Sequence, residues 1–131
     1  MKTKQIFLSV VLGVFFWLSA ALIVRYVGTL VFTAENPYLI LFYLLGIPIT
    51  GGFLLIIKLI IGISYADMLK PIVVMTITAT LLDGVALAWF RPLYSSSFEV
   101  ALHGAAWILW GAGLGLLAAF VLNARGNEVN K

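Results

Sequence analysis

The sequence predicts an all-α integral membrane protein, a bundle of four helices in which consecutive helices are antiparallel neighbours. Hydrophobic residues make up 63% of the 131-residue chain and charged residues only 10%, far outside the range of a soluble domain. The apolar residues fall into four runs, each close to the roughly 20 residues that a helix needs to cross a bilayer. Four spans and short connections use nearly the whole chain, so we expect a single membrane domain, 1–131.

The first helix is expected over residues 5–33. Its apolar core, residues 6–24, is longer than the roughly 7–15 apolar residues of a signal peptide, so we interpret it as a retained helix. Arg25 interrupts the run, but the following residues are apolar again up to Phe32. Arg25 is therefore expected inside the helix, near the edge of the outer leaflet.

The second helix is expected over residues 38–61. Asn36 and Pro37 precede it, and Asn as the N-cap followed by Pro is a strong start signal. Pro48 lies in its middle beside Gly46 and predicts a kink, because proline lacks the N–H of a regular helix. Broken helices at this depth can bind ions or anionic substrates, yet Pro and Gly are also ordinary in membrane helices. We favour a kink without a ligand.

The third helix is expected over residues 71–90 and the fourth over residues 97–123. Pro92 follows the third apolar run and marks its end. Ser96 and Glu99 then have the spacing of a capping box, which predicts the start of the fourth helix.

The distribution of basic residues predicts the orientation in the membrane. Two of the eight Lys and Arg residues, Arg25 and Arg91, lie on one side, and the other six lie on the side of both termini. The positive-inside rule then predicts a multi-pass protein of the cytoplasmic (inner) membrane with both termini cytoplasmic. Amphipathic aromatic residues are expected at the outer interface, namely Tyr26, Tyr38, Trp89 and Tyr94.

Asp83 is the most informative single residue. It lies within the third apolar run, where a carboxylate costs roughly 3 kcal/mol or more unless it is paired, protonated or hydrated. Thr76 and Thr80 share its helical face, because residues three and four apart are neighbours on a helix. This polar face should point into the bundle, and Arg25 is the expected partner. Asp83 is either a buried structural tie or a protonatable, substrate-binding carboxylate.

The fourth helix carries a stripe of small residues, and three tryptophans lie well inside the first and fourth helices. Gly111 and Gly115 form a GxxxG motif, which allows close helix packing inside the bundle or in a homodimer. Gly104 continues the stripe. Each indole N–H needs an acceptor, which Asp83 is able to provide for one of Trp17, Trp107 and Trp110. The alternative, which we favour, is that these tryptophans pack in the core or face lipid.

The composition excludes several kinds of chemistry. The chain has no cysteine and one histidine, which excludes thiolate catalysis and the usual zinc motifs. No nucleophile–base pair or cofactor motif is present, so we predict neither enzymatic activity nor a cofactor. The net charge of +3 belongs to scattered helix ends and does not indicate nucleic-acid binding.

Several short motifs resemble a known family. They are Trp17-Leu18 and Arg25-Tyr26-x-Gly28 in the first helix, Pro48 in the second, Leu81-Leu82-Asp83-Gly84 with Trp89-Phe90-x-Pro92 in the third, and Ala106-Trp107-x-x-Trp110-Gly111 in the fourth. In these motifs the chain resembles a family of small, uncharacterised four-helix bacterial membrane proteins, a domain of unknown function. The resemblance implies a four-helix bundle in a bacterial membrane and no particular activity or site residues.

Two functional hypotheses follow. The first is a small membrane protein without catalytic activity, structural or regulatory, in which Arg25 and Asp83 form a buried polar tie. The second is a small proton- or ion-coupled transporter in which Asp83 titrates and the break at Pro48 shapes the path. The expected partners are the lipid bilayer and, through the Gly111/Gly115 face, a second copy of the chain. The small-molecule substrate of a transporter is not indicated.

Overall fold

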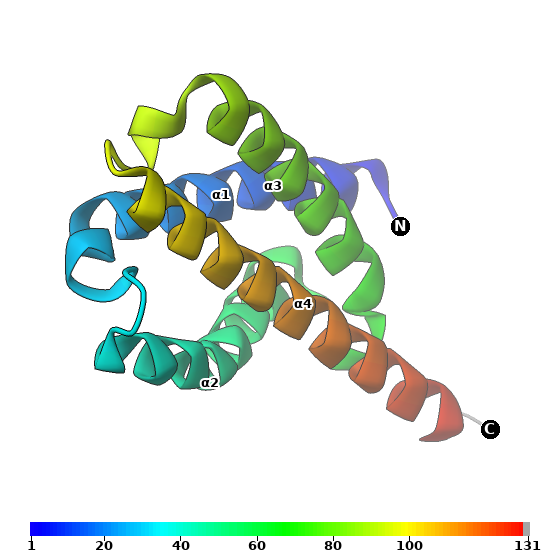
Figure 1. Cartoon of the computed structure of the whole chain (residues 1–131). Coiled ribbons are helices and arrows are strands. Elements are labelled where there is room, and N and C mark those ends of the chain that lie inside the picture. Colours follow the sequence, from blue (N-terminus) through cyan, green and yellow to red (C-terminus); the bar gives the residue numbers. More distant parts are fainter. Residues whose placement is uncertain (130–131) are drawn as a thin grey trace.

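The computed structural model describes residues 1–129 and consists of four long helices joined by short connections (Figure 1). The helices are α1 (Thr3–Val31), α2 (Pro37–Ile61), α3 (Leu69–Trp89) and α4 (Phe98–Val129), with two short 3₁₀ helices, η1 (Tyr65–Asp67) and η2 (Arg91–Leu93). All four long helices have the length and apolarity needed to cross a membrane. The predicted class, an all-α membrane bundle, is confirmed.

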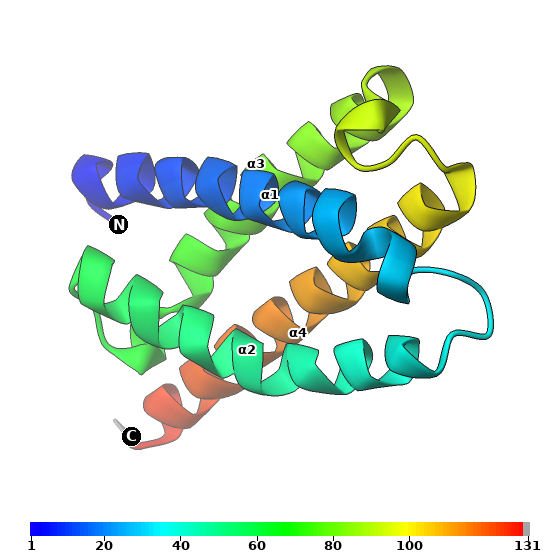
Figure 2. The same ribbon diagram turned by 90° about the vertical axis from the view of Figure 1, so that its left-hand side faces the viewer.

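The four helices surround a central axis in the order α1, α3, α4, α2. Both termini and the α2–α3 connection lie toward one end of the bundle, and the other two connections lie toward the opposite end (Figures 1 and 2). Consecutive helices therefore run in opposite directions, as predicted. The most extensive contact nevertheless joins α1 and α3, which run in the same direction and are not consecutive.

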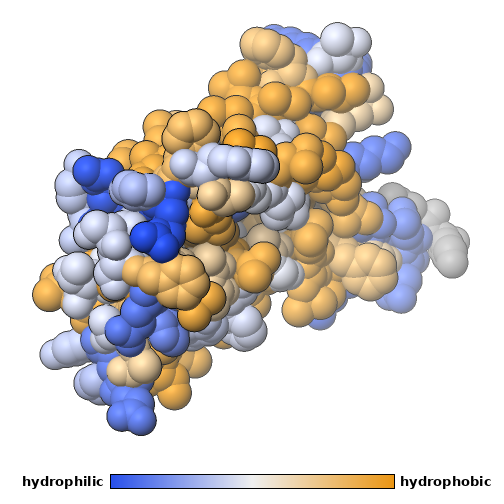
Figure 3. All heavy atoms as spheres, turned by 45° about the horizontal axis from the view of Figure 1, so that its top comes forward, coloured by the Kyte–Doolittle hydropathy of each residue, from blue (hydrophilic) through white to orange (hydrophobic). Residues whose placement is uncertain are grey.

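The outer surface of the bundle is apolar. Large hydrophobic side chains such as Leu30, Leu59 and Leu109 are exposed on the surface of three different helices. Figure 3 shows hydrophobic residues across the middle of the face in view, with hydrophilic residues gathered toward its two ends. A belt of this kind matches the hydrocarbon core of a bilayer with polar headgroups on both sides.

Two separate clusters of buried apolar side chains hold the helices together. The terminal cluster lies toward the end with both termini and is formed by Leu12, Leu54, Ile57, Ile61, Met68, Ile72, Met75 and Ala119. The distal cluster lies toward the other end and is formed by Ala21, Val24, Val31, Phe32, Ala86, Tyr94, Val100 and Ala101. The middle of the bundle lies between them.

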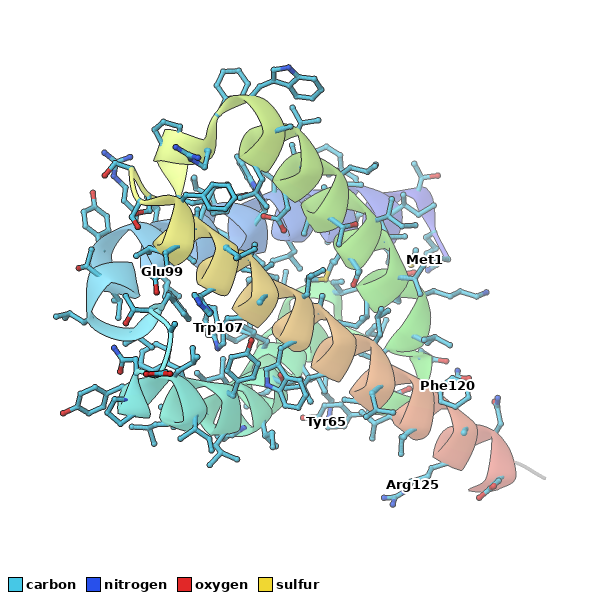
Figure 4. The ribbon with its side chains drawn as sticks, in the orientation of Figure 1. Met1, Tyr65, Glu99, Trp107, Phe120 and Arg125 are labelled. Atoms are coloured by element: carbon cyan, nitrogen blue, oxygen red, sulfur yellow. The ribbon has the colours of Figure 1, made fainter. Side chains whose placement is uncertain are left out.

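The caps agree with the prediction at α2 and differ at α4. The side chain of Asn36 accepts a hydrogen bond from the Tyr38 N–H, as expected for an N-cap ahead of Pro37. Glu99 does not close a capping box with Ser96. Its carboxylate instead accepts a hydrogen bond from the Ala34 N–H at 2.7 Å, because the α1–α2 connection lies beside the start of α4 (Figure 4).

The helix α4 is longer than predicted, since it extends to Val129 and not to residue 123. Its last turns lie against η1. The amide of Asn123 donates to the Ala66 carbonyl oxygen at 3.0 Å, and a Cβ on Gly126 would lie only 2.3 Å from the Ala66 Cβ. This contact fixes the end of α4 to the α2–α3 connection.

Pro48 does not interrupt α2, which is continuous from Pro37 to Ile61. Figure 2 shows that the helix changes direction near its middle. Proline removes one backbone N–H and crowds the preceding turn, which explains a bend without a break. The hydroxyl of Thr50 donates to the Gly46 carbonyl oxygen at 2.6 Å and adds a bond within this bent segment.

Candidate central cavity

A cavity of about 190 Å³ lies inside the bundle and borders the terminal cluster, whose residues Leu54, Ile57, Ile72 and Met75 are part of its lining. Its lining comes from the middle of all four helices and is mostly apolar. The lining residues that bear on its chemistry are Phe16, Trp17, Thr50, Phe53, Thr76, Thr80, Asp83, Trp107, Gly111 and Gly115. Of the residues singled out in the sequence, Asp83, Thr76, Thr80, Trp17 and Trp107 are therefore brought together at one cavity.

Asp83 is the only charged residue among those that line the cavity. It is 9% exposed, and its Oδ1 accepts a hydrogen bond from the Tyr94 hydroxyl at 2.5 Å. Oδ2 has no hydrogen-bond partner among residues 1–129. Arg91 Nε is the single polar side-chain atom there that is both fully buried and unpartnered, so Oδ2 is accessible. One carboxylate oxygen is thus bound within the fold, whereas the other has no protein donor in the described chain, and the residue lines the cavity.

Tyr94 connects Asp83 to α1. Its hydroxyl accepts a hydrogen bond from Trp17 Nε1 at 3.0 Å while donating to Asp83. The sequence suggested that Tyr94 lies at the outer interface, and this expectation is wrong, because the side chain is 0% exposed. The 3₁₀ helix η2 turns the chain back toward the bundle, so Tyr94 enters the distal cluster. We call Trp17, Tyr94 and Asp83 the polar chain.

Arg25 does not contact Asp83. Its guanidinium donates to the Pro92 carbonyl oxygen at 3.0 Å, and no salt bridge joins it to Asp83 anywhere in the described chain. The reason is depth, since Arg25 lies two turns beyond Trp17 on α1 and reaches the connection after α3. Arg25 and Asp83 consequently bind the same short segment, Pro92–Tyr94, from two different helices.

The other two candidate tryptophans, Trp107 and Trp110, both bind α2. Trp107 Nε1 donates to the Phe42 carbonyl oxygen at 3.2 Å (Figure 4), and Trp110 Nε1 donates to the Tyr43 carbonyl oxygen at 2.9 Å. Neither indole binds Asp83. Pro48, which faces outward, does not line the cavity. Its bend instead occurs one turn beyond the carbonyls that these tryptophans use.

The small residues of α4 have two different environments. A Cβ on Gly104 would lie 2.5 Å from Val24 Cγ1, so Gly104 allows α4 to approach α1 closely. Gly111 and Gly115 line the cavity, and a Cβ on either would meet no heavy atom of another element within 4 Å. The close helix packing expected at Gly111 and Gly115 is therefore not found, because the neighbouring helices diverge there around the cavity.

Residues that the sequence did not single out complete the site. Phe16 and Phe53 line the cavity, and their ring centroids are 4.8 Å apart. No signal distinguished them from the other apolar residues of their helices. Within residues 1–129, no group of three or more His, Cys, Asp or Glu side chains is close enough to hold a metal ion.

One family model matches the chain over residues 31–126, most of its length. That family, DUF5367, is described as a family of unknown function.

The chain belongs to the DUF5367 family.

The resemblance seen in the sequence is thereby confirmed as membership of an uncharacterised family. The matched segment contains Asp83, Tyr94 and Trp107, and it begins after Trp17 and Arg25. No curated protein and no solved structure matches the chain. The family description supplies no activity, and the four-helix membrane architecture rests on the structure.

Proposed function

We propose that this chain is a membrane protein without catalytic activity that binds a small molecule in its central cavity. The observation that carries the proposal is the cavity itself, because all four helices contribute to its lining and the lining includes Asp83, whose Oδ2 has no donor in the described chain. An ionisable residue inside a membrane protein that faces a cavity usually marks a binding or transport site. Of the two hypotheses from the sequence, this geometry supports the ligand site of the second, while transport itself is a separate candidate.

The size of the cavity suits a small organic ligand. An engineered apolar cavity of about 150 Å³ binds benzene, and this cavity measures about 190 Å³. Ligand pockets between bundle helices are typically apolar with a few polar groups that orient the ligand. Asp83, Thr76 and Thr80 supply such groups here, all from one face of α3.

The polar tie of the first hypothesis is retained in a different form. We propose that the polar chain fixes the position of the Asp83 carboxylate and holds the α3–α4 connection over the distal end of the cavity. Arg25 supports the same connection through the Pro92 carbonyl. The tie then serves the binding site, since it involves only one of the two carboxylate oxygens.

Membrane orientation and assembly belong to the same proposal. The basic residues favour cytoplasmic termini in an inner membrane. The lipid bilayer is the required environment for four apolar spans. The Gly111/Gly115 face supports ligand binding better than it supports homodimerisation, because it lines the cavity within one copy.

Saturable binding of a neutral probe tests the proposal. The probe is 4-bromobenzyl alcohol, whose bromine quenches nearby tryptophan fluorescence, and the protein is the Trp89→Phe/Trp110→Phe variant in nanodiscs. Only the cavity-lining Trp17 and Trp107 then remain. We expect saturable quenching that disappears in Gly111→Leu, because the added side chain occupies the cavity.

Gly113→Leu is the matched control. Gly113 is exposed and does not line the cavity, and a Cβ added there would have no neighbouring atom within 4 Å, so quenching should persist in this variant. Equal quenching in both variants, or quenching that rises linearly with the probe in the lipid, would contradict cavity binding.

Transport is the second candidate function. The observation that favours it is that two apolar clusters bound the cavity, one toward each end of the bundle. Alternate loosening of these clusters would expose the cavity to each side in turn, as in transporters with a central binding site. Counterflow of radiolabelled benzylamine in sealed proteoliposomes tests this function. Uptake should depend on Asp83, and rates equal to those of protein-free vesicles would exclude it.

A further inference from the structure

We infer that the ligand of the central cavity is a small organic cation, an ammonium group attached to an apolar body. This inference rests on the proposed function and specifies its ligand class. The ammonium group contacts Asp83 Oδ2, the aromatic residues of the lining surround it, and the body fills the rest of the cavity.

The charge of the site favours a cation. Asp83 is the one charged residue in the lining, and no Lys, Arg or His of residues 1–129 forms a salt bridge with it. Burial of an uncompensated carboxylate in a membrane bundle is costly. A cationic ligand offsets that cost by pairing with the carboxylate, whereas an anionic ligand adds a second like charge.

The two carboxylate oxygens have different tasks. Oδ1 accepts the Tyr94 hydroxyl, which is itself fixed by Trp17. Oδ2 is accessible and has no donor in the described chain. An ammonium group donates hydrogen bonds and accepts none, so it matches this oxygen. The polar chain also limits rotation of the carboxylate, so Oδ2 is held in one position.

The aromatic lining is the second, independent observation. Four aromatic side chains contribute to the cavity, namely Phe16, Trp17, Phe53 and Trp107. Aromatic rings attract cations through their quadrupoles, and sites that recognise alkylated ammonium groups commonly combine several rings. A metal ion, by contrast, needs several oxygen or nitrogen ligands. The hydroxyls of Thr50 and Thr80 already donate to helix carbonyls.

A pair of probes that differ mainly in charge tests the inference. The pair is 4-bromobenzylamine, which is protonated at neutral pH, and the neutral 4-bromobenzyl alcohol, measured by the same fluorescence quenching in nanodiscs of uncharged lipid. In the Trp89→Phe/Trp110→Phe protein, where only the cavity-lining tryptophans report, we expect the amine to bind about tenfold or more tightly than the alcohol. In Asp83→Asn, we expect this preference to fall to about twofold or less, with the affinity for the alcohol retained.

Asp67→Asn is the matched control, because it removes a carboxylate that lies in η1 outside the cavity. It should keep the full preference for the amine. Phe53→Leu provides a second variant that leaves the polar chain intact. It should reduce the preference about threefold while the alcohol still binds.

The outcomes separate the two proposals. If the alcohol binds saturably and the amine binds no better, the ligand is not a cation, and the proposed binding function stands. If neither probe binds in a saturable way, the proposed function itself is wrong. The comparison of the two probes in the Trp89→Phe/Trp110→Phe protein keeps Asp83, so misfolding of Asp83→Asn does not prevent a decision.

Discussion

At the scale of single residues, Tyr94 shows how a connection contributes to the interior of a membrane bundle. Its hydroxyl is both donor and acceptor, which lets it satisfy the Asp83 carboxylate and the Trp17 indole at the same time. No basic residue is needed for this, so the carboxylate is held without being neutralised. The residue thus explains how Asp83 is kept in place and still remains available to the cavity.

Replacement of Tyr94 by Phe is expected to destabilise the protein by roughly 1–3 kcal/mol, because two buried polar groups lose their partner together. The measurement is the free energy of unfolding in mixed micelles at neutral pH. Tyr38→Phe is the control, since Tyr38 is 60% exposed, and it should change stability by about 0.5 kcal/mol or less. Equal stabilities of the two variants would show that the polar chain does not stabilise the fold.

The pH dependence of stability offers a separate test of Tyr94. Burial raises the pKa of the Tyr94 phenol above its ordinary value, the adjacent Asp83 raises it further, and the bond from Trp17 acts in the opposite direction. A raised pKa in the folded state gives stability that is complete below the unfolded pKa, about 10 for tyrosine. That stability is lost as the pH rises toward the folded pKa.

We therefore expect the difference in unfolding free energy between wild type and Tyr94→Phe to be constant up to about pH 10 and to narrow above it. Subtracting the variant removes the contribution of the other tyrosines and lysines. Asp83 is the titratable group in contact with this hydroxyl, and it is present in both proteins that are compared. If the difference in unfolding free energy between the two proteins widens above about pH 10, the pKa of Tyr94 is not raised in the folded state.

At the scale of helices, small residues decide where α1 can approach its neighbours. A Cβ on Gly104 would lie 2.5 Å from Val24 Cγ1 on α1, and one on Gly13 would lie 2.9 Å from the Met75 carbonyl oxygen on α3. These two contacts occur at different depths and bring α1 against both helices. The GxxxG pair of α4 has no such role, because it lies where the helices separate.

Gly104→Ala is expected to cost roughly 1–3 kcal/mol of unfolding free energy, because the new methyl group overlaps the Val24 side chain. Gly113→Ala makes the same change at an exposed position and should be close to neutral. Val24→Ala should restore part of the stability lost in Gly104→Ala, since it removes the overlapping methyl groups. If the stability costs of the two single variants simply add in the double variant, the two residues do not form the contact.

At the scale of the whole molecule, the bundle is held at both ends and open in the middle. The terminal and distal clusters pack the ends, while Arg25, Glu99 and Asn123 tie the connections to the helices. This division leaves the middle of the bundle for the cavity.

The natural absence of cysteine makes orientation directly testable. A single cysteine in place of Lys2 should be protected from a membrane-impermeant maleimide added to intact spheroplasts, whereas one in place of Ser96 should be labelled. The six basic residues on the side of the termini are the reason for this expectation. Labelling of the Lys2 position and protection of the Ser96 position would reverse the orientation.

The sequence alone determined the class of the protein, the number of spans and much of the position of each helix. It could do so because each membrane helix satisfies its backbone hydrogen bonds internally and must match the bilayer thickness, so both requirements are visible within one segment. It also indicated Asp83, Thr76, Thr80, Trp17 and Trp107 as candidate residues of a polar core. All five line the cavity in the structure.

Only the tertiary structure decided which groups meet. Tyr94 reaches Asp83 because η2 folds the connection inward, whereas Arg25 is too far along α1 and binds Pro92. The indoles of Trp107 and Trp110 bind backbone carbonyls, which every residue carries, so no sequence signal marks them. Gly111 and Gly115 line a cavity because the helices diverge there, and divergence depends on side chains that belong to four separate segments. Contacts between segments depend on depth, rotation and crossing angle, which the pattern within one segment does not encode.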